Sequence, residues 1–311
     1  MLLLTRKPLP QTIAKNQQKN FMLKKVAKWV LLTVGGLLCI VLVFYVVIYF
    51  KTESTINKTY QVKTQPISIP NDSASYMRGK KIATNRGCMG CHGIELAGGE
   101  AFFDEHNPLG VLYASNITSG NGGIQYADSD WIKVLRHGVH KENKSVWLMP
   151  SQDLYQISNQ DMKDLLCYVK SFPPVDNVVP AKSIKPLGRV LLFLDKIPFL
   201  SAEMINHNAV IADSVPAVAS AEYGHYLATT CQGCHGSKLT GAPSHEPGAI
   251  APPNITATGE VGKWTVNNFM GVFHNGTTPQ GRKLDKGMPW DKFSYSDTDL
   301  KGIYLYLQSL K

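Results

Sequence analysis

The sequence predicts an all-α protein, in which a single N-terminal transmembrane helix is followed by two tandem helical domains. Three observations lead to this prediction: an uninterrupted apolar run near the N-terminus, an internal duplication, and a helical pattern at both ends of each copy. The length of 311 residues suits about two ordinary domains together with their connections.

The apolar run extends over residues 29–50 and contains no charged side chain. A helix of about twenty such residues crosses a bilayer. A cleaved signal peptide is the competing interpretation, but the run is longer than a typical signal core. The residues that follow, Lys51-Thr52-Glu53-Ser54, also lack a small-x-small cleavage site. We therefore expect an uncleaved membrane anchor.

Most of the formal net charge of +9 comes from a basic tail over residues 1–28. Without the tail the chain has 25 basic and 23 acidic residues, so the rest is nearly neutral and gives no sign of nucleic-acid binding. The basic residues of the tail are Arg6, Lys7, Lys15, Lys19, Lys24, Lys25 and Lys28. The positive-inside rule places this tail in the cytoplasm and the chain from Lys51 onward outside.

A five-residue motif occurs twice, as Cys88-Met89-Gly90-Cys91-His92 and as Cys231-Gln232-Gly233-Cys234-His235. C-x-x-C-H is the attachment signature of a c-type haem. Its two thiols can each add to a vinyl group of one porphyrin, and the adjacent imidazole becomes the proximal ligand of the iron. A zinc site would need the two cysteine pairs to converge, and a thioredoxin-like redox pair would need a βαβ setting. We therefore predict two covalently bound haem c groups.

The duplication extends beyond these motifs. Asn116-Ile117-Thr118 corresponds to Asn254-Ile255-Thr256, which we interpret as a turn beside each haem. Further matches at the same spacing are Gly138 with Gly276, Ser158 with Ser296, Asp161 with Asp299, and Tyr168 with Tyr306. The signatures lie a few residues out of this register, so the loop after the signature is expected to be longer in the first copy. We predict two domains, over residues 73–174 and 220–311.

Each predicted domain begins and ends with a helical pattern. The first helices cover residues 75–83 and 221–228, and the last helices cover residues 161–172 and 296–307. Gly79 and Gly224 are expected to let the first helix of each domain approach the last one closely.

Two connecting segments complete the predicted organisation. Residues 51–72 are polar, with Pro66 and Pro70, and are expected to form a tether. Residues 175–219 are too long for a plain connector and contain two short apolar stretches. We expect this segment to pack between the two domains; lying on the membrane surface is the alternative.

An electron carrier usually has a second axial ligand on its iron, and Met149 and Met288 are the candidates. Each precedes a proline and the last helix of its domain, and they match across the duplication within one residue. A thioether favours ferrous iron and raises the potential relative to bis-histidine ligation. The rival histidines have no histidine counterpart in the other copy; they are His106, His137, His140 and His274. We expect them to be exposed polar residues, with Arg136 or His274 as a candidate partner of a haem propionate.

With these features the chain resembles the class I cytochrome c family: an N-terminal helix, CxxCH, a Met-Pro ligand, and a C-terminal helix ending in Tyr-x-x-Ser-[LF]. More closely, the Asn-Ile-Thr element, the stretch from Trp264 to Gly276 and the two Met-Pro loops resemble the cytochrome c subunits of membrane-bound bacterial alcohol, gluconate and aldehyde dehydrogenases. The resemblance implies two tandem class I cytochrome c domains, each with one haem c.

We therefore expect a membrane-anchored dihaem cytochrome c that transfers electrons and is not itself an enzyme. Its donor would be a dehydrogenase or a quinol-oxidising complex, and its acceptor a cytochrome or a terminal oxidase. The anchor would lie in the bacterial cytoplasmic (inner) membrane, with the haem domains in the periplasm. The expected haem ligands are Cys88, Cys91, His92 and Met149 in the first domain and Cys231, Cys234, His235 and Met288 in the second.

The alternative is a dihaem enzyme, such as a peroxidase or a thiosulfate dehydrogenase. A redox sensor would need a larger output domain than the short basic tail.

Overall fold

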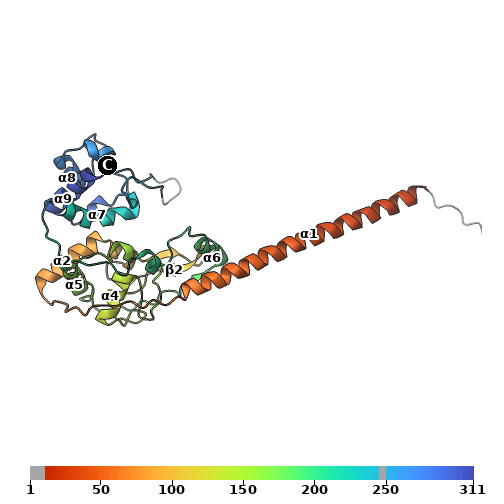
Figure 1. The fold of residues 1–311 in the computed structure, drawn as a ribbon, viewed down its shortest axis with the longest axis horizontal. Coiled ribbons are helices and arrows are strands. Elements are labelled where there is room, and N and C mark those ends of the chain that lie inside the picture. Colours follow the sequence, from red (N-terminus) through yellow and green to blue (C-terminus); the bar gives the residue numbers. More distant parts are fainter. Residues whose placement is uncertain (1–10, 245–249) are drawn as a thin grey trace, which may run out of the picture. The chain divides into compact units, whose positions relative to one another are not determined.

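The computed structural model describes residues 11–244 and 250–311, with only the backbone described for residues 11–20. Part of the predicted basic tail, residues 1–10, therefore lies outside the described residues. Helix α1 (Gln11–Ile56) contains the predicted transmembrane run, and its part from Phe21 onward is long and apolar enough to cross a membrane (Figure 1). The helix continues to Ile56, into the predicted tether, because no glycine or proline interrupts it there. From Ile56 onward the chain forms a second compact unit.

Residues 57–72 do not form the free tether that their polar composition predicts. Thr59 pairs with Lys144 in an isolated antiparallel β-bridge. Ile67 and Ile69 pack against the core of the first domain. Apolar side chains spaced among the polar ones therefore attach this segment to the first domain.

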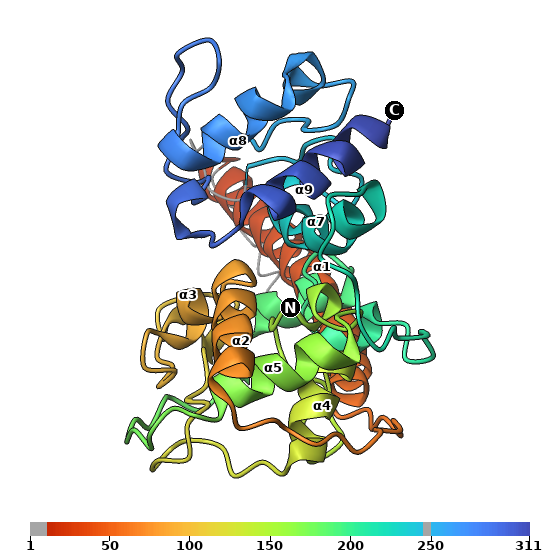
Figure 2. The same ribbon diagram turned by 90° about the vertical axis from the view of Figure 1, so that its left-hand side faces the viewer.

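The first domain is built around two packed helices, α2 (Ser73–Asn85) and α5 (Asn159–Val169) (Figure 2). Both begin at side-chain caps: Asp72 accepts a hydrogen bond from the N–H of Ser75, and Ser158 from that of Asp161. The other elements are α3 (Cys88–His92), β1 (Ala101–Phe103), β2 (Gly110–Tyr113), α4 (Asp128–His137) and the short 3-10 helix η1 (Ser151–Asp153). Their apolar faces enclose one core, which includes the fully buried Leu96 and Leu166.

The second domain repeats this plan, with α7 (Ala221–His235) packed against α9 (Asp297–Ser309). Helix α9 begins with a capping box, in which Ser296 and Asp299 satisfy each other's backbone N–H groups. The remaining elements are η3 (Glu260–Lys263), α8 (Val266–Asn275) and η4 (Trp290–Lys292). A separate apolar core, including Leu239 and Ile303, fills the space between them.

Glycine allows the close helix crossing in both domains, as the sequence predicts. A Cβ atom on Gly79 would lie 1.9 Å from the carbonyl oxygen of Asp164, and one on Gly224 would lie 1.8 Å from that of Gly302. Both partners lie on the last helix of their domain, so only glycine fits at these two crossings.

Most of the segment between the domains packs on the first domain, not between the two as we expected. Its strand β3 (Ser183–Ile184) pairs with β2 in a small antiparallel sheet of order β1-β2-β3. The segment continues as α6 (Pro186–Phe193) and η2 (Ser201–Met204). This small sheet is the one departure from the predicted all-α class among the described residues, and its strands are too short to leave an alternating pattern in the sequence.

Candidate functional site

The two cysteines of each signature lie one helical turn apart, and none of them forms a disulfide. In the first domain, helix α2 ends before the signature, and Gly87 turns the chain in the left-handed conformation (φ 71°) into the separate short helix α3. In the second domain, helix α7 runs without a break through Cys231 and Cys234 to His235. The same three-residue spacing therefore places both thiols on one face of a helix in either setting.

Each signature histidine is oriented by a backbone carbonyl. Nδ1 of His92 lies 2.8 Å from the carbonyl oxygen of Ser115, and Nδ1 of His235 lies 2.8 Å from that of Pro253. A carbonyl oxygen can only accept, so Nδ1 carries the proton and Nε2 is left with its lone pair. A metal-binding imidazole is commonly held in this way.

The Asn-Ile-Thr elements hold those carbonyls in place. Asn116 follows Ser115, and its Oδ1 accepts hydrogen bonds from the N–H (2.9 Å) and hydroxyl (2.8 Å) of Thr118. Asn254 follows Pro253 and makes the same two bonds to Thr256, at 2.9 and 2.8 Å. The predicted turns are present in both domains, and each presents the preceding carbonyl to the histidine.

The carbonyls of Ser115 and Pro253 were not predicted from the sequence. Every residue type offers a backbone carbonyl, so the two positions share no side-chain signal. The only available hint was that each directly precedes a repeated Asn-Ile-Thr element.

Burial sets the protonation of the signature side chains. It raises the pKa of the Cys88 and Cys231 thiols to about 11. It lowers the pKa of both His92 and His235, although their carbonyl partners act in the opposite direction. The imidazoles are therefore neutral at neutral pH, which is the form that binds a metal.

This donor set fits a haem c in each domain. The two thiols match the two vinyl groups, and the oriented Nε2 matches one axial position of the iron. The zinc alternative is not supported, because no three His, Cys, Asp or Glu side chains within residues 11–244 and 250–311 are grouped to hold a metal ion.

Met149 lies on the apolar core of the first domain, together with Cys88. The preceding Leu148 adopts the left-handed conformation with φ 54°, an unusual geometry for a residue with a side chain. The amide of Ser151 then donates to the carbonyl of Met149 at 2.8 Å and begins η1. The structure thus brings Met149 and the first signature to one core.

Met288 is placed differently. Its N–H donates to the carbonyl of Asp285 (3.0 Å), and its carbonyl accepts from the N–H of Trp290 (2.8 Å). The side chain is half-buried. Leu284 and Tyr295 on either side pack against the second core, but Met288 is not among the described residues of that cluster. The structure thus does not bring Met288 to the core that Cys231 contacts.

Three of the four rival histidines contact other side chains, and the fourth, His106, is exposed as expected. Nδ1 of His140 lies 2.5 Å from Glu142, and Nε2 of His274 lies 3.2 Å from Asp297. His137 is buried, contrary to the expectation that it is exposed, because His207 from the segment between the domains covers it, with 3.1 Å between their Nδ1 atoms.

Arg136 is also buried in the first domain. Its guanidinium donates to the carbonyls of Tyr155 (2.9 Å) and Ile157 (2.6 Å) and to Oδ1 of Asn159 (3.0 Å). These bonds tie helix α4 to the start of α5. The arrangement therefore favours a structural role for Arg136 over the propionate contact suggested from the sequence.

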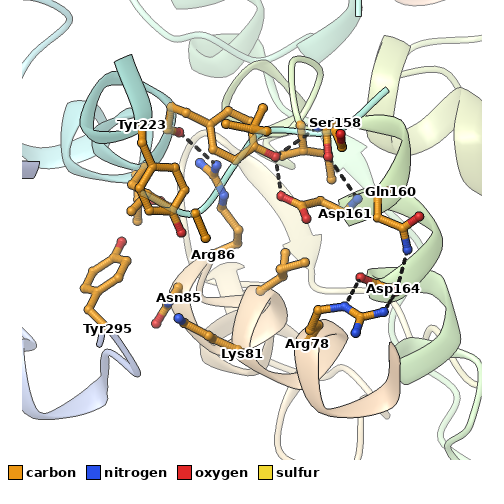
Figure 3. Close-up of a pocket in the computed structure, with 18 residues that line it drawn as sticks. Arg78, Lys81, Asn85, Arg86, Ser158, Gln160, Asp161, Asp164, Tyr223 and Tyr295 are labelled. Atoms are coloured by element: carbon orange, nitrogen blue, oxygen red, sulfur yellow. Dashed lines mark hydrogen bonds and ion pairs between the residues drawn. The ribbon is translucent and has the colours of Figure 1, made fainter. Parts of the chain in front are cut away.

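A cavity of about 270 Å³ lies between the two domains (Figure 3). Its lining includes Lys81, Asn85 and Arg86 from the first domain and Tyr223, Tyr226 and Tyr295 from the second. Charged side chains of the lining pair with one another, as where Nε of Arg78 donates to Oδ2 of Asp164 (2.6 Å). Neither signature contributes to the lining. The cavity is therefore part of the interface between the domains and is separate from both signatures.

Comparison with known proteins agrees with this geometry. The cytochrome c family matches the chain twice, over residues 76–173 and 221–311, which together make up more than half of it. Each match falls on one copy of the duplication and contains one signature.

Two relatives are similar to parts of the chain. The fructose dehydrogenase cytochrome subunit of Gluconobacter japonicus is 33% identical over 119 residues, covering 33% of this chain and 24% of the relative. A diheme cytochrome c-type of Cereibacter sphaeroides is 28% identical over 132 residues, covering 38% of this chain and 43% of the relative. The chain thus matches less than half the length of either relative. The repeated family match confirms the resemblance seen in the sequence: the chain belongs to the cytochrome c family, with two tandem domains and two covalently bound haem c groups.

Proposed function

We propose that the protein is a membrane-anchored dihaem cytochrome c that carries electrons between a membrane or periplasmic donor and a downstream acceptor. The observation that carries this proposal is the matched pair of histidine–carbonyl hydrogen bonds, from His92 to Ser115 and from His235 to Pro253, each beside the two cysteines of its signature. Each haem iron, when bound, supplies a one-electron couple, and the protein supplies ligands, burial and orientation.

We propose the following haem ligands. In the first domain, Cys88 and Cys91 would form the thioethers, His92 would bind the iron through Nε2, and Met149 would provide the second axial ligand. In the second domain these roles fall to Cys231, Cys234, His235 and Met288. In each domain the thioether would favour ferrous iron and raise the potential relative to bis-histidine ligation.

Helix α1 supports the membrane location. Its apolar part is long enough to cross a bilayer, and the basic residues of the tail precede it. We infer an anchor in the bacterial cytoplasmic membrane, with the N-terminus in the cytoplasm and both haem domains in the periplasm. The topology is testable by protease treatment of spheroplasts, which should digest the haem domains and spare the tail.

The relatives bear on the redox partners. One relative is the cytochrome subunit of a fructose dehydrogenase, so a dehydrogenase is a suitable electron donor for this chain. A quinol-oxidising complex is the other candidate donor, and a cytochrome or terminal oxidase is the candidate acceptor. Isolation of the protein from native membranes with its bound partners would identify them.

Methionine substitutions test the ligand assignment. Met149→Ala and Met288→Ala should each lower the midpoint potential of one haem and open it to exogenous ligands, because a ferrous-stabilising thioether is lost. Met77→Ala provides the control, since Met77 is exposed on α2, and it should change neither potential. If the spectra and potentials of both haems survive both ligand substitutions, the assignment of the methionines is wrong.

A dihaem enzyme remains the second candidate, favoured by one observation. Residues 285–287, just before Met288, are exposed, so the second haem has the more accessible ligand loop. A peroxidase or a thiosulfate dehydrogenase would need such an exchangeable position. Assays of peroxide and thiosulfate turnover by the purified protein distinguish this candidate from a pure electron carrier.

A further inference from the structure

The loop that carries Met149 is covered by residues 197–205 of the segment between the domains, which we call the latch. The N–H of Leu148 donates to the carbonyl of Phe199 (3.0 Å), and the N–H of Ser201 donates to that of Val146 (3.2 Å). Between these bonds, Trp147 and Leu200 form an antiparallel β-bridge. The latch is therefore paired with the ligand loop as a short strand would be.

Side chains add to this pairing. The hydroxyl of Ser201 donates to the carbonyl of Met149 itself at 2.5 Å, and Oγ of Ser145 accepts from the N–H of Ala202 at 3.0 Å. Both serines are fully buried. The ring of Phe199 lies 4.7 Å from that of Trp147. Opening the loop around Met149 would thus break several buried contacts at once.

The second domain lacks such a latch among its described residues. Both ligand loops start alike: the N–H of Val146 donates to the carbonyl of Gly138, and the N–H of Leu284 to that of Gly276, each at 2.8 Å. Beyond this point the second loop is exposed over residues 285–287. Its bonds there are local, from Gly287 and Met288 to Asp285.

Different residues cover the matching glycines. A Cβ atom on Gly138 would meet Ser201 and Ala202 of the latch, whereas one on Gly276 would meet the ring of Trp290, at 2.3 Å. The latch thus occupies the place that a side chain of the ligand loop itself occupies in the second domain. The first loop is hydrogen-bonded to a separate segment, whereas the bonds of the second loop, among the described residues, stay within its own domain.

We propose that the latch fixes Met149 as a permanent iron ligand, with Ser201 as a positioning residue, and that Met288 is the methionine that exchanges. This inference rests on the proposed function, in which both methionines are axial ligands. Exchange requires the ligand loop to open locally, and local opening is harder where more buried contacts must break. The first haem is then a closed electron relay, and the second is the one that small ligands reach.

Imidazole titration of the oxidised, haem-loaded full-length protein in detergent tests the inference, with the absorption spectrum as readout. Met149→Ala and Met288→Ala assign each phase to a domain. We expect two phases, with the second-domain haem binding imidazole at the lower concentration. Ser201→Ala should raise the affinity of the first haem for imidazole about fivefold, as expected for the loss of one hydrogen bond. Leu187→Ala, at an exposed position on α6, is the control and should leave both phases unchanged.

The proposal is wrong if the two haems bind imidazole with equal affinity, or if the first-domain haem binds it at the lower concentration. It is also wrong if Ser201→Ala leaves the imidazole affinity of the first-domain haem unchanged. Hydrogen exchange of the unsubstituted protein gives a second test, with slower exchange expected for residues 145–149 than for residues 284–288. Similar rates in both loops would also overturn it. A failure of the proposed ligands is distinguishable, because the two methionine substitutions would then leave the spectra unchanged before any imidazole is added.

Discussion

Lys81 of the first domain and Asp299 of the second form an ion pair, with 2.5 Å between Nζ and Oδ2. A reciprocal contact lies beside it, where the hydroxyl of Tyr226 in the second domain donates to Asp161 in the first. Asp161 corresponds to Asp299 in the duplication, and aligning the crossing glycines makes Lys81 correspond to Tyr226. The two domains therefore exchange equivalent contacts, as the two halves of a two-fold symmetric dimer do.

We predict that both contacts hold the domains together. Lys81→Ala removes the cation beside Asp299, whose side chain is 2% exposed, although Tyr223 still donates to it at 2.7 Å. Tyr226→Phe removes the partner of Asp161 and of the amide of Ser158. Each substitution should lower the free energy of unfolding by about 1–2 kcal/mol, measured by urea denaturation of the haem-loaded protein.

Lys80→Ala is the control for the first substitution, because Lys80 is the exposed neighbour on the same helix. It should change the unfolding free energy by less than about 0.5 kcal/mol. Wild-type stability in both Lys81→Ala and Tyr226→Phe would show that the domain interface does not contribute to stability.

The helix crossings give a second prediction. Gly79→Ala and Gly224→Ala place a methyl group within 2 Å of a backbone carbonyl oxygen of the opposing helix. The helices must then move apart, and each substitution should cost about 3 kcal/mol, the upper end of the range for overpacking.

Gly271→Ala is the matched control, since Gly271 also lies within a helix, but a Cβ atom added there would meet no neighbouring atom of the described residues within 4 Å. This substitution should be neutral or should stabilise the protein by up to about 1 kcal/mol, because alanine is the better helix former. Equal thermal unfolding temperatures for the three variants would contradict the packing argument.

The features that could be predicted from the sequence are those made by residues close together along the chain. The signatures, the turn at Asn116 and the bounding helices are encoded by local patterns, and the duplication shows each pattern twice. The latch is different, because Phe199 and Ser201 meet the Met149 loop only through the tertiary fold. Nothing in the local sequence marks such a contact. The burial of His137 was missed for the same reason, since its partner is seventy positions away.

Arg86 gives a third prediction, because it lies near both signatures. It precedes Cys88 by two residues, and it also bonds to Thr229 on the helix that carries Cys231. Its charge therefore interacts electrostatically with the positions of both of these cysteines. A positive charge disfavours the more positive ferric state, so Arg86→Gln should lower both midpoint potentials, by on the order of tens of millivolts.

Two further variants separate charge from structure. Arg86→Lys keeps the charge and should restore most of both potentials in a redox titration. Arg78→Gln removes a cation that is paired with Asp164, and its effect on either haem should be smaller. A change in only one potential, or no rescue by lysine, would contradict a shared electrostatic role of Arg86.

His137 gives the last prediction, a dependence of stability on pH. Burial, followed by the nearby His207 and Arg136, lowers the pKa of His137 from 6.5 to about 4. The unfolded chain therefore binds a proton at His137 more readily than the folded protein does. The contribution of neutral His137 to the free energy of unfolding is complete above about pH 6.5 and is lost as the pH falls towards 4. The loss should reach roughly 3 kcal/mol, and His137→Gln should flatten this part of the profile in urea denaturation. His106→Gln, at an exposed loop position, should retain the wild-type slope. An equally steep loss of stability in His137→Gln would assign the acid sensitivity to other groups.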